Sequence, residues 1–163
     1  MLQLIIVMET RSSNKSDYMY IKSTIDYYYK PRTFGITKLY AETKSKLITQ
    51  DAKIESIKAK TDRNVIVILC ADYDREEELN KIIVTYCNAN HYELVWMNPN
   101  IEEVYWGKHV DDKDKEREAI KFQQKKNKLL PTLTNISSQE PLNKKKTSNI
   151  LIILDKYLQR DST

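Results

Sequence analysis

An apolar segment that ends in two aspartates constrains the fold of this chain more than any other feature. Val65 to Leu69 form a continuous apolar run, rich in β-branched residues, and Asp72 and Asp74 follow it closely. Runs of this kind are typical of strands that are covered on both faces. Because side chains two residues apart on an extended chain point the same way, we expect both carboxylates to converge on one hard cation. The alternative is a polar strand end followed by a helix cap, since Asp is a preferred capping residue.

Strands alternate with helices over residues 1–99. The hydrophobic pattern predicts strands over residues 2–8, 36–41, 64–71 and 92–97. Helices are predicted between them, in a segment that ends before Pro31 and over residues 44–61 and 75–90. The last of these helices is expected to bury Leu79, Ile82, Ile83 and Tyr86. This order of elements predicts an α/β fold of Rossmann-like type, with a mainly parallel β-sheet and helices on both faces.

The rest of the chain changes character, and extra carboxyl-terminal helices are expected there. Residues 100–128 are highly charged and have a helical pattern, whereas residues 129–147 contain two prolines and a lysine triplet, which predicts a mobile surface loop. Residues 148–160 predict a short apolar helix that docks on the sheet, with Ser148 or Asn149 as its cap. A length of 163 residues is sufficient for one domain with its own core.

Polar residues follow three of the predicted strands at the same end. Glu9 follows the first strand, Asp72 and Asp74 end the third, and Asn98 ends the fourth. The carboxyl ends of parallel strands meet at one edge of a sheet, and ligands of open α/β sheets bind outside that edge. The sequence therefore predicts that Glu9, Asp72, Asp74 and Asn98 face one ligand-binding rim.

The composition excludes several kinds of site. The chain has two glycines, so it lacks the glycine-rich phosphate loops of the GxGxxG and GxxxxGK types. Its two cysteines are too few for a disulfide framework and lack the spacing of zinc ligands, which favours a reducing, cytoplasmic setting. The apolar run at the amino terminus is too short for a signal peptide or a membrane span. A net charge of +4 permits nucleic acid as a partner, and the lysine-rich second half could contact phosphates.

Several of these motifs resemble known families. An acidic residue after the first strand, a DxD motif after the third and an alternating α/β frame between them resemble the Toprim domain of topoisomerases, primases and OLD-family nucleases. The segment MNPNIEEVYWGKHV is similar to a helix of RloB-like proteins, and TSNILIILDKYL resembles the helix that closes those proteins. Two positions depart from the pattern, because Thr10 replaces a glycine and Ile101 replaces an aromatic residue.

The resemblance implies a metal-dependent nuclease, or a related phosphoryl-transfer enzyme, in restriction-linked or abortive-infection defence against phage. It implies that Glu9 is the Toprim glutamate, a general base or acid that also contacts metal, and that Asp72 and Asp74 bind Mg²⁺ or Mn²⁺. Glu102 and His109 match the acidic residue and the histidine of the RloB helix, which implies catalytic roles for them. The alternative interpretation is a non-catalytic binding or regulatory module that docks on a partner protein such as a defence ATPase.

Overall fold

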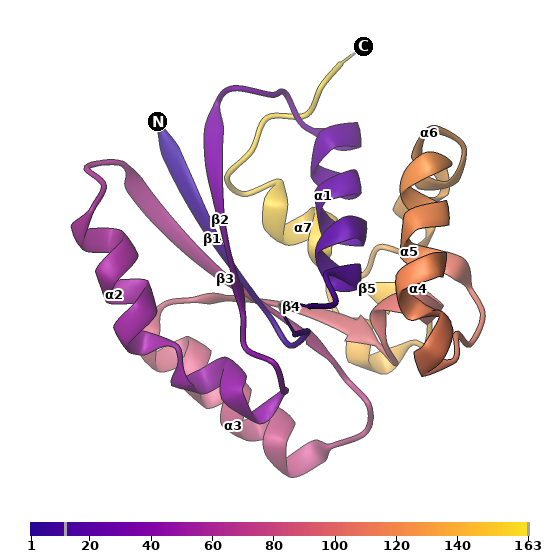
Figure 1. Cartoon of the computed structure of the whole chain (residues 1–163), viewed down its shortest axis with the longest axis horizontal. Helices are drawn as coiled ribbons and strands as arrows, with labels where there is room; N and C mark the ends of the chain where they lie inside the picture. Colours follow the sequence, from indigo (N-terminus) through magenta and orange to yellow (C-terminus); the bar gives the residue numbers. More distant parts are fainter. Residues whose placement is uncertain (12, 163) are drawn as a thin grey trace.

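A β-sheet forms the middle layer of the fold, and helices cover both of its faces (Figure 1). The computed structural model describes residues 1–11 and 13–162, and their sheet has five strands in the order β2-β1-β3-β4-β5. The first four strands are parallel and β5 is antiparallel to β4. The strands are β1 (Leu2–Met8), β2 (Phe34–Tyr40), β3 (Asn64–Asp72), β4 (Glu93–Asn98) and β5 (Thr147–Ser148). The Rossmann-like α/β fold expected from the sequence is therefore present.

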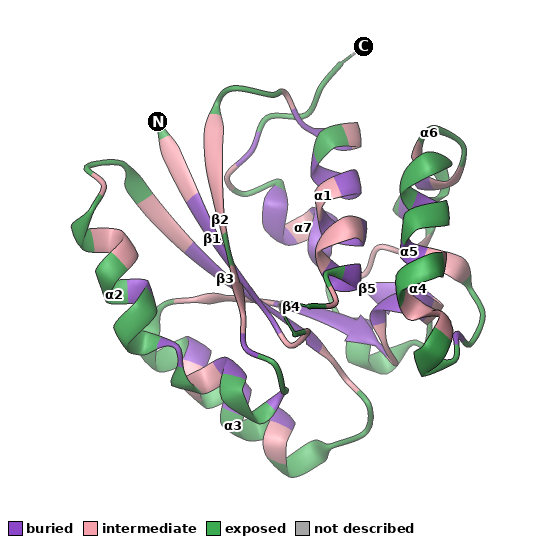
Figure 2. Ribbon diagram, viewed as in Figure 1, coloured by how far each residue is buried: buried purple, intermediate pink, exposed green. Residues whose placement is uncertain are grey.

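Alternating side chains of the central strands feed two separate cores. Leu4 and Ile6 of β1 belong to the core on one face, whereas Ile5 and Val7 belong to the core on the other. Every one of these side chains is at most 1% exposed, as expected for a strand with neighbours on both sides and helices on both faces. Figure 2 shows the resulting pattern, in which burial follows the middle of the sheet and the outer faces of the helices stay exposed.

The helices divide between the two faces of the sheet. The face that carries Ile5 is covered by a 3₁₀ helix and two α-helices: η1 (Ser45–Thr49), α2 (Asp51–Ala59) and α3 (Glu77–Asn90). The other face is covered by α1 (Ser16–Tyr28), α4 (Ile101–Trp106), α5 (Lys115–Gln124), α6 (Lys126–Leu129) and α7 (Ile150–Leu154). In this layer the rings of Tyr20, Tyr105 and Phe122 contact one another with centroids 5.0–5.2 Å apart, which joins α1, α4 and α5.

Two expectations about the helices on the first face were wrong in detail. Residues 44–61 form the 3₁₀ helix η1 and then α2, rather than one helix, and the side chain of Gln50 at the break donates to the carbonyl of Lys46 (3.0 Å). Ile82 of α3 is 51% exposed, whereas its neighbour Ile83 is fully buried. Adjacent positions of an α-helix point about 100° apart, so only one of these two isoleucines can face the sheet.

Residues 129–147, which were expected to form a mobile surface loop, contain short regular elements. They include η3 (Leu130–Ile136), η4 (Pro141–Asn143) and β5, and Leu130 and Leu133 are buried in the core. The helix expected over residues 148–160 is limited to α7, before which Ser148 accepts a hydrogen bond from the N–H of Ile150 (3.1 Å). The side chain of Asn149 does not cap this helix, because it is engaged by the backbone of β4. A further 3₁₀ turn, η2 (Asp112–Asp114), precedes α5.

Candidate metal centre

The strand order creates a switch point at the carboxyl edge of the sheet. β2 lies on one side of β1 and β3 lies on the other, so the connections that follow β1 and β3 cross opposite faces of the sheet. Ligands of doubly wound sheets bind in the crevice at this point. Glu9 follows β1 directly, and Asp72 is the last residue of β3. These two acidic side chains therefore lie where the topology itself opens a binding crevice.

Three carboxylates meet at this edge and are called the acidic cluster below: Glu9, Asp72 and Asp74. One oxygen of each lies within 4.8 Å of those of the other two. The N–H of Asp72 donates to Oε2 of Glu9 (2.9 Å), and the N–H of Ile101, at the start of α4, donates to Oδ1 of Asp72 (2.9 Å). The structure thus brings together three of the four residues expected at the rim, and backbone groups orient two of them.

Asp72 ends β3, but Asp74 lies in the turn that follows, whereas the sequence pattern suggested extended chain at both aspartates. Asp74 has a left-handed φ of +46°, and its N–H donates to the carbonyl of the residue that follows β4 (3.1 Å). The carbonyl of Tyr73 accepts from Nζ of Lys44 and from Nδ2 of Asn80, both at 3.0 Å. The two carboxylates therefore converge because long-range hydrogen bonds shape the turn, and not because of the period of a strand.

A crevice of about 670 Å³ lies beside the acidic cluster and contains further charged groups. Asp17, in the first turn of α1, and Glu102, in α4, both line it and are 7% and 2% exposed. Nζ of Lys115, the first residue of α5, lies 3.6 Å from Oε1 of Glu102. Oε2 of Glu102 is buried and has no hydrogen-bond partner among the described residues. The crevice thus holds more buried carboxylate than its lysine can pair.

Crowding of acids in a partly dry crevice raises their pKa values. Burial raises the pKa of Glu9 to about 7, against the hydrogen bond from the N–H of Asp72 and with a contribution from Asp74. Burial also raises the pKa of Asp72, and the neighbouring Glu9 adds to this rise. Burial and Glu102 together raise the pKa of Asp17. These carboxylates favour a state in which a proton or a cation offsets their charge.

Two lysines reduce the rise in carboxylate pKa but do not remove it. Burial raises the pKa of Asp74 although Lys44 lowers it, and burial raises the pKa of Glu102 although Lys115 lowers it. Burial alone would lower the pKa of Lys115, but the carboxylate of Glu102 raises it above its usual range. Lys115 therefore stays charged in the crevice.

Asn98 and His109 lie apart from the acidic cluster. The side chain of Asn98 is buried and donates to the carbonyls of Pro141 (2.8 Å) and Lys144 (3.2 Å). The expectation that Asn98 faces the rim was wrong, because this amide anchors the segment before β5. The ring of His109 lies after α4, is 74% exposed and pairs with Asp111 (3.2 Å). It does not line the crevice.

The donor set of the acidic cluster fits a hard divalent cation. All three groups are carboxylates, and Mg²⁺ and Mn²⁺ prefer oxygen ligands, often with water in the remaining positions. The hydrogen bonds to Glu9 and Asp72 engage one oxygen of each and leave the second oxygen available. A cation at this point would also favour the charged forms of all three groups, whose pKa values are raised chiefly by burial.

Sequence reasoning missed two groups of this crevice. Asp17 was not singled out, although the first turn of a helix that follows β1 lies near the carboxyl edge of the sheet. Its place at the start of the first helix after Glu9 was a signal that could have been used. Lys115 follows α4 after an irregular segment, and no local pattern connects it to Glu102.

Comparison with known proteins does not identify a family. No family model matches the chain, and neither the curated proteins nor the solved structures provide a match. None of the helices in residues 1–11 and 13–162 is long and apolar enough to cross a membrane.

Proposed function

We propose that the protein is a magnesium- or manganese-dependent nuclease, or a related phosphoryl-transfer enzyme, of Toprim type. The observation that carries this proposal is the convergence of Glu9, Asp72 and Asp74 within 4.8 Å at the switch point of the sheet. The Toprim-like and RloB-like motifs of the sequence support the same assignment. They also support a role in defence against phage or other foreign nucleic acid, and the use of only two cysteines supports a cytoplasmic setting.

Asp72 and Asp74 would hold the cation, and Glu9 would contact it through the oxygen that the N–H of Asp72 leaves available. The cation, when bound, offsets negative charge on the reacting phosphodiester and activates water. Because the N–H of Ile101 donates to the carboxylate of Asp72, the start of α4 fixes the position of this ligand relative to the crevice. Glu9 could alternatively receive the proton of the attacking water, which is the role that the Toprim resemblance implies.

Glu102 and Lys115 would act from the other side of the crevice. Glu102 lies beside the cluster with Oε2 unpaired among the described residues, so it can orient a water molecule near the cation. Lys115, held 3.6 Å from Glu102, supplies a positive charge near an incoming phosphate. The resemblance also implies a catalytic role for His109, but its exposed ring lies outside the crevice and we assign it no step.

Cleavage of labelled DNA and RNA tests this proposal directly. Purified protein is incubated with single strands and duplexes in Mg²⁺, Mn²⁺ or chelator, beside Asp72→Asn and Asp62→Asn. Asparagine can still accept the N–H of Ile101, so Asp72→Asn should fold, and Asp62 is an exposed residue just before the opposite end of β3. Metal-dependent cleavage that only Asp72→Asn abolishes supports the assignment, whereas equal cleavage by all three proteins contradicts it.

An apolar surface on α3 favours a second candidate function, a module that binds a partner protein such as a defence ATPase. A depression of about 420 Å³ is lined by Ile48, Ile82 and Tyr86, and the side chain of Ile82 is 51% exposed. Exposed apolar surface of this kind often marks a protein interface. A binding module would keep its affinity for the ATPase in Asp72→Asn and lose it in Ile82→Glu, the opposite of the pattern expected for a metal-dependent enzyme.

A further inference from the structure

The aromatic ring of Tyr73 lies on the other side of the turn that carries the acidic cluster. It lines a pocket of about 530 Å³ between this turn and α3, called the Tyr73 pocket below, together with Asn80, Val84, Trp96 and Leu142. The rings of Tyr73 and Trp96 meet edge to face, with centroids 6.4 Å apart and an interplanar angle of 87°. Tyr73 is half-buried, so the pocket has one partly open aromatic wall, one residue away from Asp72 and from Asp74.

Asn80, which lines the pocket, has a hydrogen-bond acceptor without a partner among the described residues. Nδ2 of Asn80 donates to the carbonyl of Tyr73 (3.0 Å), which fixes the direction of the amide. Its Oδ1 is buried without a partner among the described residues, and the residue is only 5% exposed. Buried polar atoms normally have a hydrogen-bond partner, and an N–H group of a ligand can be the donor to this oxygen. The remaining wall is mainly apolar.

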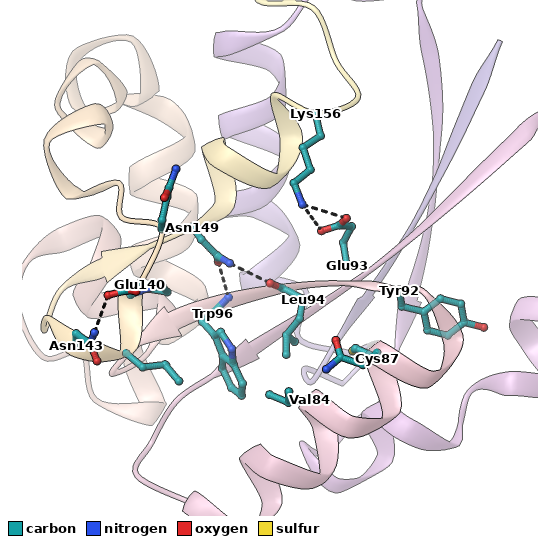
Figure 3. Close-up of a pocket in the computed structure, with 14 residues that line it drawn as sticks. Val84, Cys87, Tyr92, Glu93, Leu94, Trp96, Glu140, Asn143, Asn149 and Lys156 are labelled. Atoms are coloured by element: carbon teal, nitrogen blue, oxygen red, sulfur yellow. Dashed lines mark hydrogen bonds and ion pairs between the residues drawn. The ribbon is translucent and has the colours of Figure 1, made fainter.

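The Tyr73 pocket continues into a groove along the edge of β4. Val84, Trp96 and Leu142 line both the Tyr73 pocket and a neighbouring cavity of about 590 Å³, in which the indole of Trp96 points toward Val84 on α3 (Figure 3). Val84 and Leu142 remain 37% and 36% exposed. The groove therefore begins with the apolar side chains that the two cavities share and continues into a more polar lining along β4.

We propose that the Tyr73 pocket receives an unpaired nucleobase next to the phosphate that the acidic cluster holds, an inference that rests on the proposed function. A nucleobase has a flat π-face that stacks on an aromatic ring and N–H groups on its edge that can reach Oδ1 of Asn80. Bases of a duplex are paired and stacked, and one of them can enter such a pocket only after it leaves the helix. The substrate class is therefore single-stranded nucleic acid, or a duplex with an unpaired base at the cleavage point.

Binding in the absence of metal separates this inference from the chemistry. Fluorescence anisotropy is measured with a labelled single strand of DNA, one of RNA, and the matching duplexes, all in chelator with full-length protein. The variants are Tyr73→Leu, which removes the ring, and Tyr73→Phe, which keeps it. Val84→Trp fills the pocket from α3, and Ala89→Trp places the same ring on α3 at an exposed residue that does not line the pocket.

Tyr73→Leu and Val84→Trp should weaken single-strand binding about tenfold or more, because stacking contributes roughly 1–3 kcal/mol per base and about 1.4 kcal/mol is a factor of ten. Tyr73→Phe and Ala89→Trp should bind single strands like the unaltered protein, and duplex binding should be weaker than single-strand binding in all of these proteins. The DNA and RNA arms identify the nucleic acid. Equal binding by Tyr73→Leu, or no binding of either single strand by the unaltered protein, overturns the inference.

The cleavage assay distinguishes failure of the proposed nuclease from failure of the proposed base pocket. Binding that depends on Tyr73, without cleavage of any substrate in Mg²⁺ or Mn²⁺, retains the base pocket and refutes the nuclease. Metal-dependent cleavage with the same preference for single strands in Tyr73→Leu retains the nuclease and refutes the base pocket.

Discussion

Carboxylates in two regions of this protein have opposite surroundings. Near the carboxyl terminus, Asp155 accepts two hydrogen bonds from Arg160 (2.7 and 3.0 Å) and one from the hydroxyl of Tyr29 (2.9 Å), and these three residues are called the carboxyl-terminal clasp below. Arg160 lowers the pKa of Asp155, whereas burial raises the pKa values of Glu9 and Asp72.

This difference separates a carboxylate that is paired within the fold from carboxylates that lie beside one another. In the clasp, every charge has a partner within the chain, and the guanidinium also lies 4.8 Å from the ring centroid of Tyr28. In the acidic cluster, by contrast, the half-buried Glu9, the buried carboxylate of Asp72 and the exposed Asp74 face one another, and no arginine or lysine is hydrogen-bonded to them among the described residues. Carboxylates that crowd one another in this way favour a bound proton or cation that offsets their charge.

Removing one charge from the acidic cluster should have the largest effect. Glu9→Gln should reduce metal-dependent cleavage roughly a thousandfold, about 4 kcal/mol of barrier, because a cation ligand or a proton acceptor is lost. Gln can still accept the N–H of Asp72, so the fold should be unchanged. Single-turnover kinetics on the preferred substrate measure the effect. Asp155→Asn in the clasp should cleave at the normal rate, and a comparable loss in both variants would erase the distinction.

The pH dependence of stability should differ in sign between the two regions. Without metal, the free energy of unfolding should fall as pH rises from about 4.5 to about 7, because Glu9 binds a proton more tightly in the folded state. The fall is about 3 kcal/mol at most, since each pKa unit corresponds to about 1.4 kcal/mol. The pKa of Asp155 is lowered in the folded state, so its contribution to the free energy of unfolding should instead be lost only as pH falls below its unfolded pKa of 3.8.

Urea unfolding in chelator at a series of pH values measures the effect of Glu9. The difference between the unaltered protein and Glu9→Gln isolates the contribution of this carboxyl, because other groups titrate in both proteins. If the free energies of unfolding of the two proteins differ by a constant amount from pH 4.5 to 7, the raised pKa of Glu9 is contradicted.

Breaking the clasp should have the smallest effect. Arg160→Ala removes an ion pair whose side chains are 41% and 42% exposed, so screening by solvent limits the loss to about 1 kcal/mol, including the contact with the ring of Tyr28. Urea unfolding should show this loss equally with and without Mg²⁺. Arg117→Ala is the matched control and should change stability less, because the side chain of Arg117 is 63% exposed in its pair with Asp114. A loss for Arg160→Ala that appears only with metal would connect the clasp to the cluster.

The sheet and the identity of the acidic cluster could be predicted from the sequence because both depend on local patterns. Continuous apolar runs specify strands that are buried on both faces, and acids that follow such runs must lie at the carboxyl edge of a parallel sheet. Glu9, Asp72 and Asp74 follow this logic and do meet there.

The remaining features depend on contacts between distant segments. Asp17 and Lys115 line the crevice because α1 and α5 pack together. These helices are far apart in the sequence, and no sequence pattern predicts their contact. Asn98 looked like a rim residue, but its amide found carbonyl partners in a segment more than forty residues later along the chain. The composition of residues 129–147 suggested a loop, although Leu130 and Leu133 are apolar enough to hold part of it on the core.

Binding of Mn²⁺ to the metal-free protein, followed by titration calorimetry near neutral pH, tests the central claim that the acidic cluster is a cation site. The unaltered protein and Asp62→Asn should bind the ion saturably, and both should melt at a higher temperature when it is present, because a ligand of the native state raises apparent stability. Asp72→Asn should show neither effect. Binding that is unchanged in Asp72→Asn, or no binding to the unaltered protein, would contradict the account.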